Sequence, residues 1–223
     1  MGFLKHLKEE IALIKERDAA IHSTMEVFLY PSFKVMLHYR FAHRLYTKKH
    51  YFLARWVSQR AVRKTGIEIH PGAQIGKGFF IDHGNGVIIG ETTIIGDNVT
   101  LYQGVTLGGT GKDVGKRHPT LGNNVMVGAG AKVLGPFQIG DNTKIAANAV
   151  VLKEMPENST AVGIPAKVVR QAGRRVDDLD QIHIPDPVSQ EIARLEEKLE
   201  ALSRSLDELK AAKSRRTKPK QEK

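Results

Sequence analysis

The sequence has 223 residues, 41% of them hydrophobic, which suits one large or two small domains with a buried core. It contains no cysteine, which excludes disulfides. No apolar run approaches the roughly 20 residues of a membrane span, and the N-terminus lacks a signal-peptide pattern. We therefore expect a cytoplasmic protein. The net charge of +10 suits an anionic small molecule better than nucleic acid, because much of it lies in the last eleven residues.

Helical patterns occupy the first predicted domain, residues 1–65. Apolar residues at spacings of three and four predict a helix over 3–29. Pro31 suits the first turn of a second helix. A third is predicted over 52–64, with Gly66 as its C-cap. We therefore expect a small N-terminal α-helical domain.

A six-residue repeat defines the second predicted domain, residues 66–170. An aliphatic residue recurs in each hexad and is often followed by glycine. The aliphatic positions are Ile69, Ile75, Ile81, Ile89, Ile95, Leu101, Leu107, Leu121, Val127, Val133, Ile139, Ile145 and Val151. This period is typical of a parallel β-helix, in which stacked coils supply the core. After Val151 the period fails, and 162–169 is predicted as a closing strand.

Two departures from the period predict the working corners. The step from Ile81 to Ile89 is eight, so two extra residues lie within 82–86. The step from Leu107 to Leu121 is fourteen, which extrudes a loop over 108–120. A solenoid tolerates insertions at its corners, where they often form a binding face. Both insertions carry histidine and charged residues.

The C-terminal part has a different pattern. Residues 171–185 are predicted to be a linker. A heptad seam over 186–212 predicts a C-terminal coiled-coil helix, which we expect to pair with copies of itself rather than dock on the body. Residues 213–223 are predicted to be a disordered basic tail.

His83 is the strongest candidate for catalysis. It lies in the first insertion between Asp82 and Gly84, and Glu68 precedes it by fifteen residues. If a coil contains three hexads, Glu68 lies near the neighbouring level and can orient the imidazole as a general base. The pattern alone leaves open a surface histidine beside an unrelated carboxylate. His70, in an uninterrupted hexad, is interpreted as structural or exposed.

The extruded loop supplies groups that suit anions. Arg117 can bind a carboxylate through two parallel hydrogen bonds, and His118 follows it. The segment from Gly108 to Lys112 offers backbone N–H groups and a lysine, which suit a phosphate or a pantetheine.

Several of these stretches closely resemble the serine O-acetyltransferases, the acetyl-CoA-dependent family that makes O-acetylserine on the way to cysteine. They are Ile67–Gly72, Ile81–Thr92, Gln103–Lys112 and Lys116–Pro119. The likeness runs from about Asp18 to Lys167. Residues 163–166, Gly-Ile-Pro-Ala, resemble the closing motif of hexapeptide acyltransferases in general.

The resemblance implies a left-handed parallel β-helix, a homotrimer and active sites between subunits. It implies that His83 takes the proton of the L-serine hydroxyl while the oxygen attacks the thioester of acetyl-CoA. Its carboxylate partner is Asp in many members and is Glu68 here. Asp82 and Asp18 match positions that hold the substrate ammonium, although Ala19 replaces the proline of an Arg-Asp-Pro-Ala segment.

The resemblance also implies the remaining contacts. Arg117 and His118 match the residues for the serine carboxylate, whereas Gly109 and Ala129 match backbone positions that meet coenzyme A. L-cysteine is implied as a feedback inhibitor. No metal, nucleic acid or membrane is expected.

Two departures from the family bear on assembly. The N-terminal helical part is shorter than in the long members that pair two trimers, so we expect a trimer, with the 186–212 helix available to run along its threefold axis. Long members often end in the Ile that docks into O-acetylserine sulfhydrylase. The ending here, Gln221-Glu222-Lys223, argues against that complex.

Three alternatives remain at this point. One is an acyltransferase of the same scaffold acting on a sugar or xenobiotic, although Asp82 and Arg117 suit an amino-acid zwitterion better. Another is a zinc enzyme like the γ-class carbonic anhydrases, using His70, His83 and His118. The third is a scaffold without catalysis, which leaves both insertions unexplained.

Overall fold

The computed structural model describes residues 3–18, 20–111 and 114–171, together with 194–195, 198–199 and 201–205. Side chains are described from Leu7 onward. The chain divides into two units, 1–184 and 185–223. In the part of the chain that the structure describes, no helix is long and apolar enough to cross a membrane.

The N-terminal elements are α1 (Phe3–Arg17), the 3₁₀ helix η1 (Glu26–Leu29), α2 (Pro31–Thr47) and α3 (Tyr51–Thr65). α2 begins at Pro31, and α3 ends at Gly66 with φ 71°, as predicted. The prediction of one helix over 3–29 is wrong. After α1 the Asp18 carboxylate accepts a hydrogen bond from the Ala20 N–H at 2.8 Å. This local turn competes with the helix and ends it.

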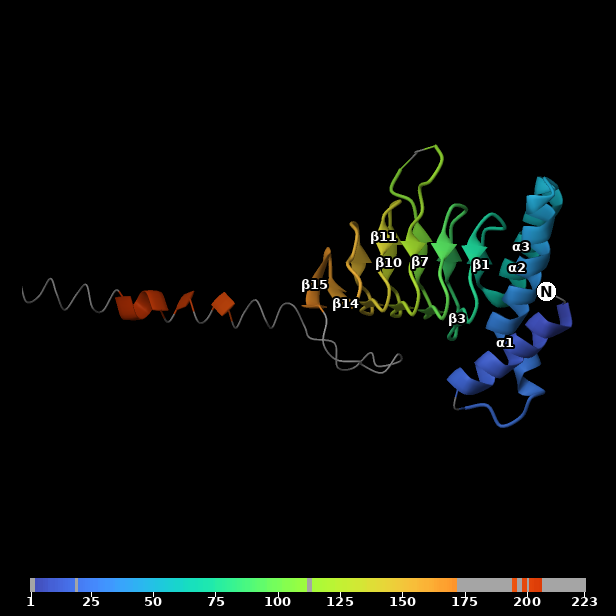
Figure 1. Cartoon of the computed structure of the whole chain (residues 1–223), viewed down its shortest axis with the longest axis horizontal. Coiled ribbons are helices and arrows are strands. Elements are labelled where there is room, and N and C mark those ends of the chain that lie inside the picture. Colours follow the sequence, from blue (N-terminus) through green and yellow to red (C-terminus); the bar gives the residue numbers. More distant parts are fainter. Residues whose placement is uncertain are drawn as a thin grey trace, which may run out of the picture. The chain divides into compact units, whose positions relative to one another are not determined.

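Fifteen short strands follow, and the described strands form three sheets along a β-helix (Figure 1). The strands are β1 (Glu68–Ile69), β2 (Gln74–Ile75), β3 (Phe80–Ile81), β4 (Ile88–Ile89), β5 (Ile94–Ile95), β6 (Thr100–Leu101), β7 (Thr106–Gly108), β8 (Thr120–Leu121), β9 (Met126–Val127), β10 (Lys132–Leu134), β11 (Gln138–Ile139), β12 (Lys144–Ile145), β13 (Val150–Val151), β14 (Ser159–Gly163) and β15 (Ala166–Gln171). The sheet orders are β1-β4-β7-β10-β13, β11-β8-β5-β2 and β15-β14-β12-β9-β6-β3. Each coil thus adds one strand to each sheet.

The register keeps the aliphatic hexad positions stacked in the core. Val133 pairs with Val151 one coil later, at the regular spacing. Ile95 pairs with Leu121 although the extruded loop lies between them. The insertions therefore leave the core unchanged and are confined to corners, as the sequence predicts. Almost all of the hexad aliphatics are buried in one continuous cluster.

The helical layer is fixed to the first coil by buried contacts. Ile14 of α1, Val27 of η1 and Phe33 of α2 pack with Phe80 of β3 in a second apolar cluster. The Ser58 hydroxyl on α3 donates to the Ile69 carbonyl at 2.8 Å. The helices therefore have a defined position over β1 and β3.

The far end of the β-helix closes with an antiparallel hairpin of β14 and β15. The prediction of a single closing strand over 162–169 is wrong. The chain reverses between Gly163, whose φ is 98°, and Ala166, and Pro165 has no N–H with which to continue a ladder.

In the second unit, residues 194–195, 198–199 and 201–205 are helical and exposed. The rest of the predicted 186–212 helix, the tail over 213–223 and all but the first residue of the linker lie outside the described residues.

Three edges run along the β-helix where its sheets meet. The "His83 edge" contains the corners that follow β3, β6, β9 and β12. The "loop edge" contains those that follow β1, β4, β7 and β10. The third contains an asparagine ladder, in which Asn124 donates to Asn142 at 3.0 Å and Asn142 to Asn158 at 2.9 Å. Figure 1 shows the extruded loop on the edge opposite β3.

Candidate active site

His83 is held in a tight turn on the His83 edge. The Gly84 N–H donates to the Asp82 carbonyl at 2.6 Å, so His83 is the central residue of a three-residue turn, with φ 55°. Among the described residues, the other non-glycine residues with positive φ are Lys49 and five asparagines, and asparagine tolerates this conformation. Such strain is concentrated at functional sites. The side chain is 74% exposed and therefore open to a substrate.

Gly84 is needed for this turn. A Cβ there would lie 2.5 Å from Ile67 Cδ1, and φ is 87°. The two inserted residues can bulge outward only because Gly84 has no side chain. The backbone conformation of the turn thus explains why the insertion predicted from the sequence contains a glycine directly after His83.

Two aspartates lie around the exposed imidazole. Asp82 Oδ1 is 4.0 Å from His83 Nε2. Asp18, at the end of α1, accepts a hydrogen bond from the Tyr30 hydroxyl at 2.6 Å. That bond chiefly lowers the pKa of Asp18, and the charge of His83 acts in the same direction. The same bond raises the pKa of Tyr30 to about 12. Two carboxylates therefore give this edge an anionic character.

Glu68 has a different partner from the predicted one. Its Oε1 lies 3.6 Å from Nη2 of Arg55 on α3. Both Glu68 and His83 are described, and no hydrogen bond or ion pair joins them in this chain. The orienting role of Glu68 stays a prediction.

Arg117 lies on the loop edge, where Glu91 binds it. Nη2 of Arg117 donates to Glu91 Oε2, and the Tyr46 hydroxyl on α2 donates to Glu91 Oε1 at 2.7 Å. Both hydrogen bonds lower the pKa of Glu91, and the bond from Tyr46 has the larger effect. The same hydrogen bond raises the pKa of Tyr46 to about 12. Glu91 therefore remains ionised and links the helical layer to the loop.

Thr92 fixes the backbone of the loop where it returns to the β-helix. Its Oγ1 accepts hydrogen bonds from the N–H groups of Arg117 and His118 at 3.0 and 3.1 Å. The Thr92 carbonyl accepts from Lys116 Nζ at 2.7 Å. The loop end is thus held by the corner one coil below it.

His118 is buried against Gly90. The Thr92 N–H donates to His118 Nδ1 at 3.1 Å, so the neutral ring carries its proton on Nε2. Burial lowers the pKa of His118, and the Arg117 charge acts in the same direction. A Cβ at Gly90 would lie 2.0 Å from His118 Cδ2. Gly90 therefore makes room for the ring.

The predicted coenzyme contacts lie on both edges. Gly109 is at the base of the loop, where a Cβ would lie 3.0 Å from the Arg117 carbonyl. Ala129 is on the His83 edge. Beside it, Gly86, Gly104 and Gly130 stack in successive coils with φ of 75°, 71° and 71°. This column exposes backbone without side chains. Lys112 lies outside the described residues.

His70 has the structural environment that the sequence suggested. It is half-buried, and its Nδ1 accepts a hydrogen bond from the Gly72 N–H at 3.0 Å. Its ring meets that of Tyr46 edge-on at 5.7 Å. Burial lowers its pKa to about 4. Over the described part of the chain, no group of three or more His, Cys, Asp or Glu side chains is arranged to hold a metal ion.

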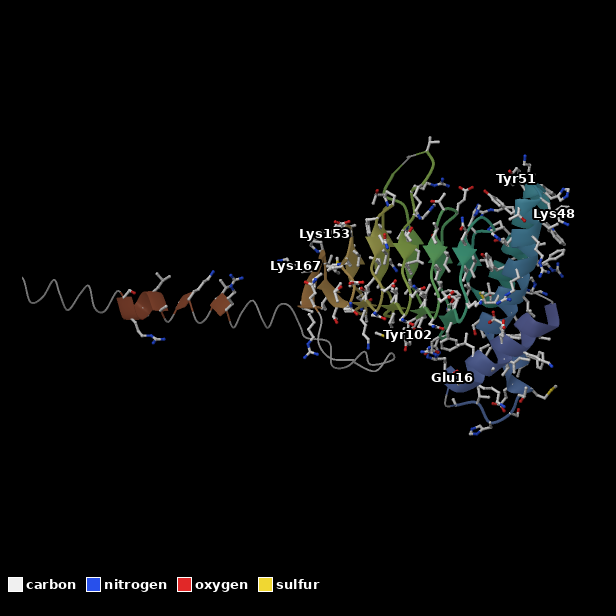
Figure 2. All side chains as sticks on the ribbon, viewed as in Figure 1. Glu16, Lys48, Tyr51, Tyr102, Lys153 and Lys167 are labelled. Atoms are coloured by element: carbon white, nitrogen blue, oxygen red, sulfur yellow. The ribbon has the colours of Figure 1, made fainter. Side chains whose placement is uncertain are left out.

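One chain places His83 and Arg117 on different edges. The segment 87–90 separates the two corners, and the three steps between its first and last Cα atoms, at about 3.3 Å each, span roughly 10 Å. Figure 2 shows Tyr102, which begins the next corner of the His83 edge, on the side of the β-helix opposite the extruded loop. The predicted site residues of one chain therefore fall into two groups on different edges.

Comparison with known proteins gives a consistent result. Residues 118–153 match the family model "Bacterial transferase hexapeptide (six repeats)". The chain is 53% identical over 202 residues to a serine acetyltransferase from Staphylococcus aureus (strain MSSA476), covering 90% of this chain and 94% of that protein.

Solved structures are similar in fold. A serine acetyltransferase from Brucella abortus strain S19 in complex with coenzyme A has a TM-score of 0.73 and 40% identity, covering 77% of this chain and 69% of that one. The Neisseria gonorrhoeae enzyme in complex with serine has a TM-score of 0.71 and 39% identity, covering 75% and 69%. A serine acetyltransferase complex with cysteine has a TM-score of 0.72 and 39% identity, covering 75% and 70%. The left-handed parallel β-helix implied by the sequence resemblance is confirmed.

Proposed function

Since this chain belongs to the serine acetyltransferase family, we propose that His83 is the general base of an active site completed by the loop edge of a second subunit. The enzyme is a serine O-acetyltransferase. It transfers the acetyl group of acetyl-CoA to the hydroxyl of L-serine, the step that leads toward cysteine. The mechanism below is our proposal for how these residues perform that reaction.

The reaction needs one proton to move twice. A ring nitrogen of His83 takes the proton of the serine hydroxyl as its oxygen attacks the thioester carbonyl carbon. The tetrahedral intermediate then collapses and the C–S bond breaks. The imidazolium returns its proton to the leaving sulfur, giving O-acetyl-L-serine and coenzyme A. The exposed imidazole in its strained turn is the observation that carries this assignment.

Glu68 is proposed to orient the imidazole by binding its other nitrogen. Its side chain is one methylene longer than the Asp of many relatives, so it has the reach to leave Arg55. The ion pair with Arg55 is partly exposed, and such pairs contribute little stability. Moving the Glu68 carboxylate from Arg55 to His83 therefore costs little free energy.

Serine is a zwitterion, and the two edges offer the matching charges. Asp18 and Asp82 are proposed to bind its ammonium beside His83. Arg117 of the neighbouring subunit is proposed to bind its carboxylate, with the Nε2–H of His118 as a further donor. The serine complex of the Neisseria gonorrhoeae enzyme supports a serine site in this fold.

The glycine column is proposed to seat the pantetheine of acetyl-CoA. Backbone groups near Gly104 and Ala129 would line it along the His83 edge, with Gly109 of the neighbouring loop opposite. Lys112 is proposed to meet the phosphates. The coenzyme A complex of the Brucella abortus enzyme supports this use of the fold.

A homotrimer is the assembly that these two groups of residues favour. The segment 87–90 separates the corners that carry His83 and Arg117, which supports a site in which the two residues come from different chains. In a closed cyclic assembly each His83 edge meets a neighbour's loop edge. Cysteine shares the ammonium and carboxylate of serine, and we propose that it competes for this site, as a cysteine complex of a relative supports.

The test is release of coenzyme A thiol from acetyl-CoA with L-serine, a galactoside or an aminoglycoside as acceptor. We expect release with serine alone. Turnover of a sugar or antibiotic without serine would contradict the substrate assignment. Full activity of His83→Asn with serine would contradict the mechanism.

A further inference from the structure

We propose that Tyr46 and Glu91 form a clamp that positions the Arg117 guanidinium for the substrate carboxylate. Through this clamp the N-terminal helical layer takes part in the choice of serine. The inference rests on the proposed role of Arg117 in binding serine. Neither Tyr46 nor Glu91 was singled out by the sequence.

The contacts define a continuous path from α2 to the loop. The Tyr46 hydroxyl donates to one oxygen of Glu91, and the other oxygen accepts from Arg117 Nη2. The Tyr46 ring packs edge-on against Tyr51 at 5.0 Å and against His70 at 5.7 Å. The hydroxyl is therefore held in place by packing as well as by its hydrogen bond.

Preorganisation is what the clamp supplies. A surface arginine populates many rotamers, and ordering it on binding costs free energy. Here the Glu91 and Arg117 side chains are 29% and 32% exposed, and Thr92 fixes the Arg117 backbone. The guanidinium has five N–H donors, and the bond from Nη2 to Glu91 leaves donors for a substrate. The arginine is thus ordered before serine arrives.

A purely electrostatic role for Glu91 predicts the opposite effect. A carboxylate beside Arg117 reduces the positive potential that a substrate carboxylate meets. If charge alone mattered, removing Glu91 would tighten serine binding. If positioning dominates, removing it weakens serine binding. The sign of the change therefore separates the two interpretations.

The clamp lies on the loop edge, away from His83 and the glycine column. Its loss should raise the KM for serine while leaving kcat and the KM for acetyl-CoA nearly unchanged. A structural defect would instead lower kcat in parallel, or lower the melting temperature by more than the loss of one partly exposed ion pair accounts for. This split identifies Tyr46 and Glu91 as positioning residues.

The experiment compares Glu91→Gln and Tyr46→Phe with wild type in the full-length protein. Gln keeps the size of Glu and removes its charge, and Phe removes only a hydroxyl. Tyr51→Phe is the matched control, because Tyr51 lines the same hollow and packs on the Tyr46 ring. The acceptors are L-serine and L-serinamide, which has the hydroxyl and ammonium but no carboxylate. Melting temperatures establish that each variant is folded.

We expect both clamp variants to raise the serine KM roughly three- to tenfold, the scale of one hydrogen bond to a charged group acting indirectly. Their activity on L-serinamide, and all parameters of Tyr51→Phe, should match wild type. An unchanged or lower serine KM in both variants would overturn the clamp. If Glu91→Gln does not fold, Tyr46→Phe decides the question.

Arg117→Ala separates the two proposals. One outcome is that Arg117→Ala abolishes the preference for serine over serinamide while both clamp variants keep that preference. In that case the clamp proposal is wrong, and the proposed serine site is retained. If Arg117→Ala keeps the preference, the proposed role of Arg117 fails, and the clamp fails with it.

Discussion

The His83 edge and the loop edge share one β-helix but differ in how their functional groups are held. On the His83 edge the imidazole is exposed on a strained turn, and its nearest ion-pair partner is 4.0 Å away. On the loop edge Arg117 and His118 are held by Glu91 and Thr92. The imidazole on the first edge is exposed and loosely held, whereas the side chains on the second edge are fixed by hydrogen bonds.

In the proposed shared site, this difference corresponds to a division of labour between subunits. A general base must approach its substrate and exchange protons, so exposure suits it. Groups that recognise a carboxylate gain from being fixed beforehand. In this proposal neither edge has both functions, and substitutions on the two edges should therefore have different kinetic signatures.

The largest effect is expected from His83→Asn. Asparagine tolerates positive φ, so the turn should persist while the base is lost. We expect kcat to fall roughly 10²–10⁴-fold, with coenzyme A binding retained. Steady-state kinetics and calorimetric titration with coenzyme A measure the two quantities. Loss of coenzyme A binding would show that the turn itself had collapsed.

Arg117→Ala should mainly change the KM for serine, whereas His83→Asn mainly changes kcat. It removes charge-assisted hydrogen bonds to the substrate carboxylate, so the serine KM should rise roughly 10–100-fold with a smaller change in kcat. The comparison between edges breaks down if Arg117→Ala lowers kcat as severely as His83→Asn does.

Glu68→Gln tests the partner of the base. Removing the negative charge should lower kcat about tenfold, since the imidazolium loses its stabilising carboxylate. Glu68→Asp is the matched control and should retain most activity. Equal rates for the Gln variant and wild type would assign the orienting role to Asp82 instead.

Ala129→Leu sharpens the assignment of the glycine column. A larger side chain on that corner should obstruct the pantetheine and raise the KM for acetyl-CoA roughly fivefold, about 1 kcal/mol. The serine KM should remain within about twofold of wild type, which corresponds to a few tenths of a kcal/mol. A selective change in the serine KM would move the coenzyme site elsewhere.

The smallest effect concerns stability against acid. The folded pKa of Glu91 lies below its ordinary value of 4.5, so its contribution is present above that pH and is lost as pH falls through the folded pKa. The pair is partly exposed, and we expect less than about 1 kcal/mol. Thermal melts of wild type and Glu91→Gln from neutral to acidic pH should converge below pH 4.5. Parallel curves would refute the linkage.

The sequence predicted the β-helix because every coil repeats the same physical constraint, one inward aliphatic residue per hexad. His83 and Arg117 were found because they interrupt that repeat. Glu91 and Thr92 were missed because they occupy a regular corner, and Tyr46 because it lies 45 residues before Glu91 in sequence.

The errors of the sequence prediction were local. The end of α1 depends on one carboxylate that bonds a nearby N–H, which apolar periodicity does not register. The closing hairpin depends on a reversal within Gly163–Ala166. The first error concerns Asp18, a predicted site residue that lies directly after α1 and not within a helix, whereas the second lies at the far end of the β-helix.

Subunit complementation tests most directly whether the site is shared. His83→Asn and Arg117→Ala chains are refolded together and assayed at serine concentrations far below the KM of the second variant. In randomly mixed trimers roughly one site in four combines an intact His83 with an intact Arg117 from different chains. We predict recovery of about that fraction of wild-type activity. A mixture that exchanges subunits and stays as inactive as its parents would contradict a shared site.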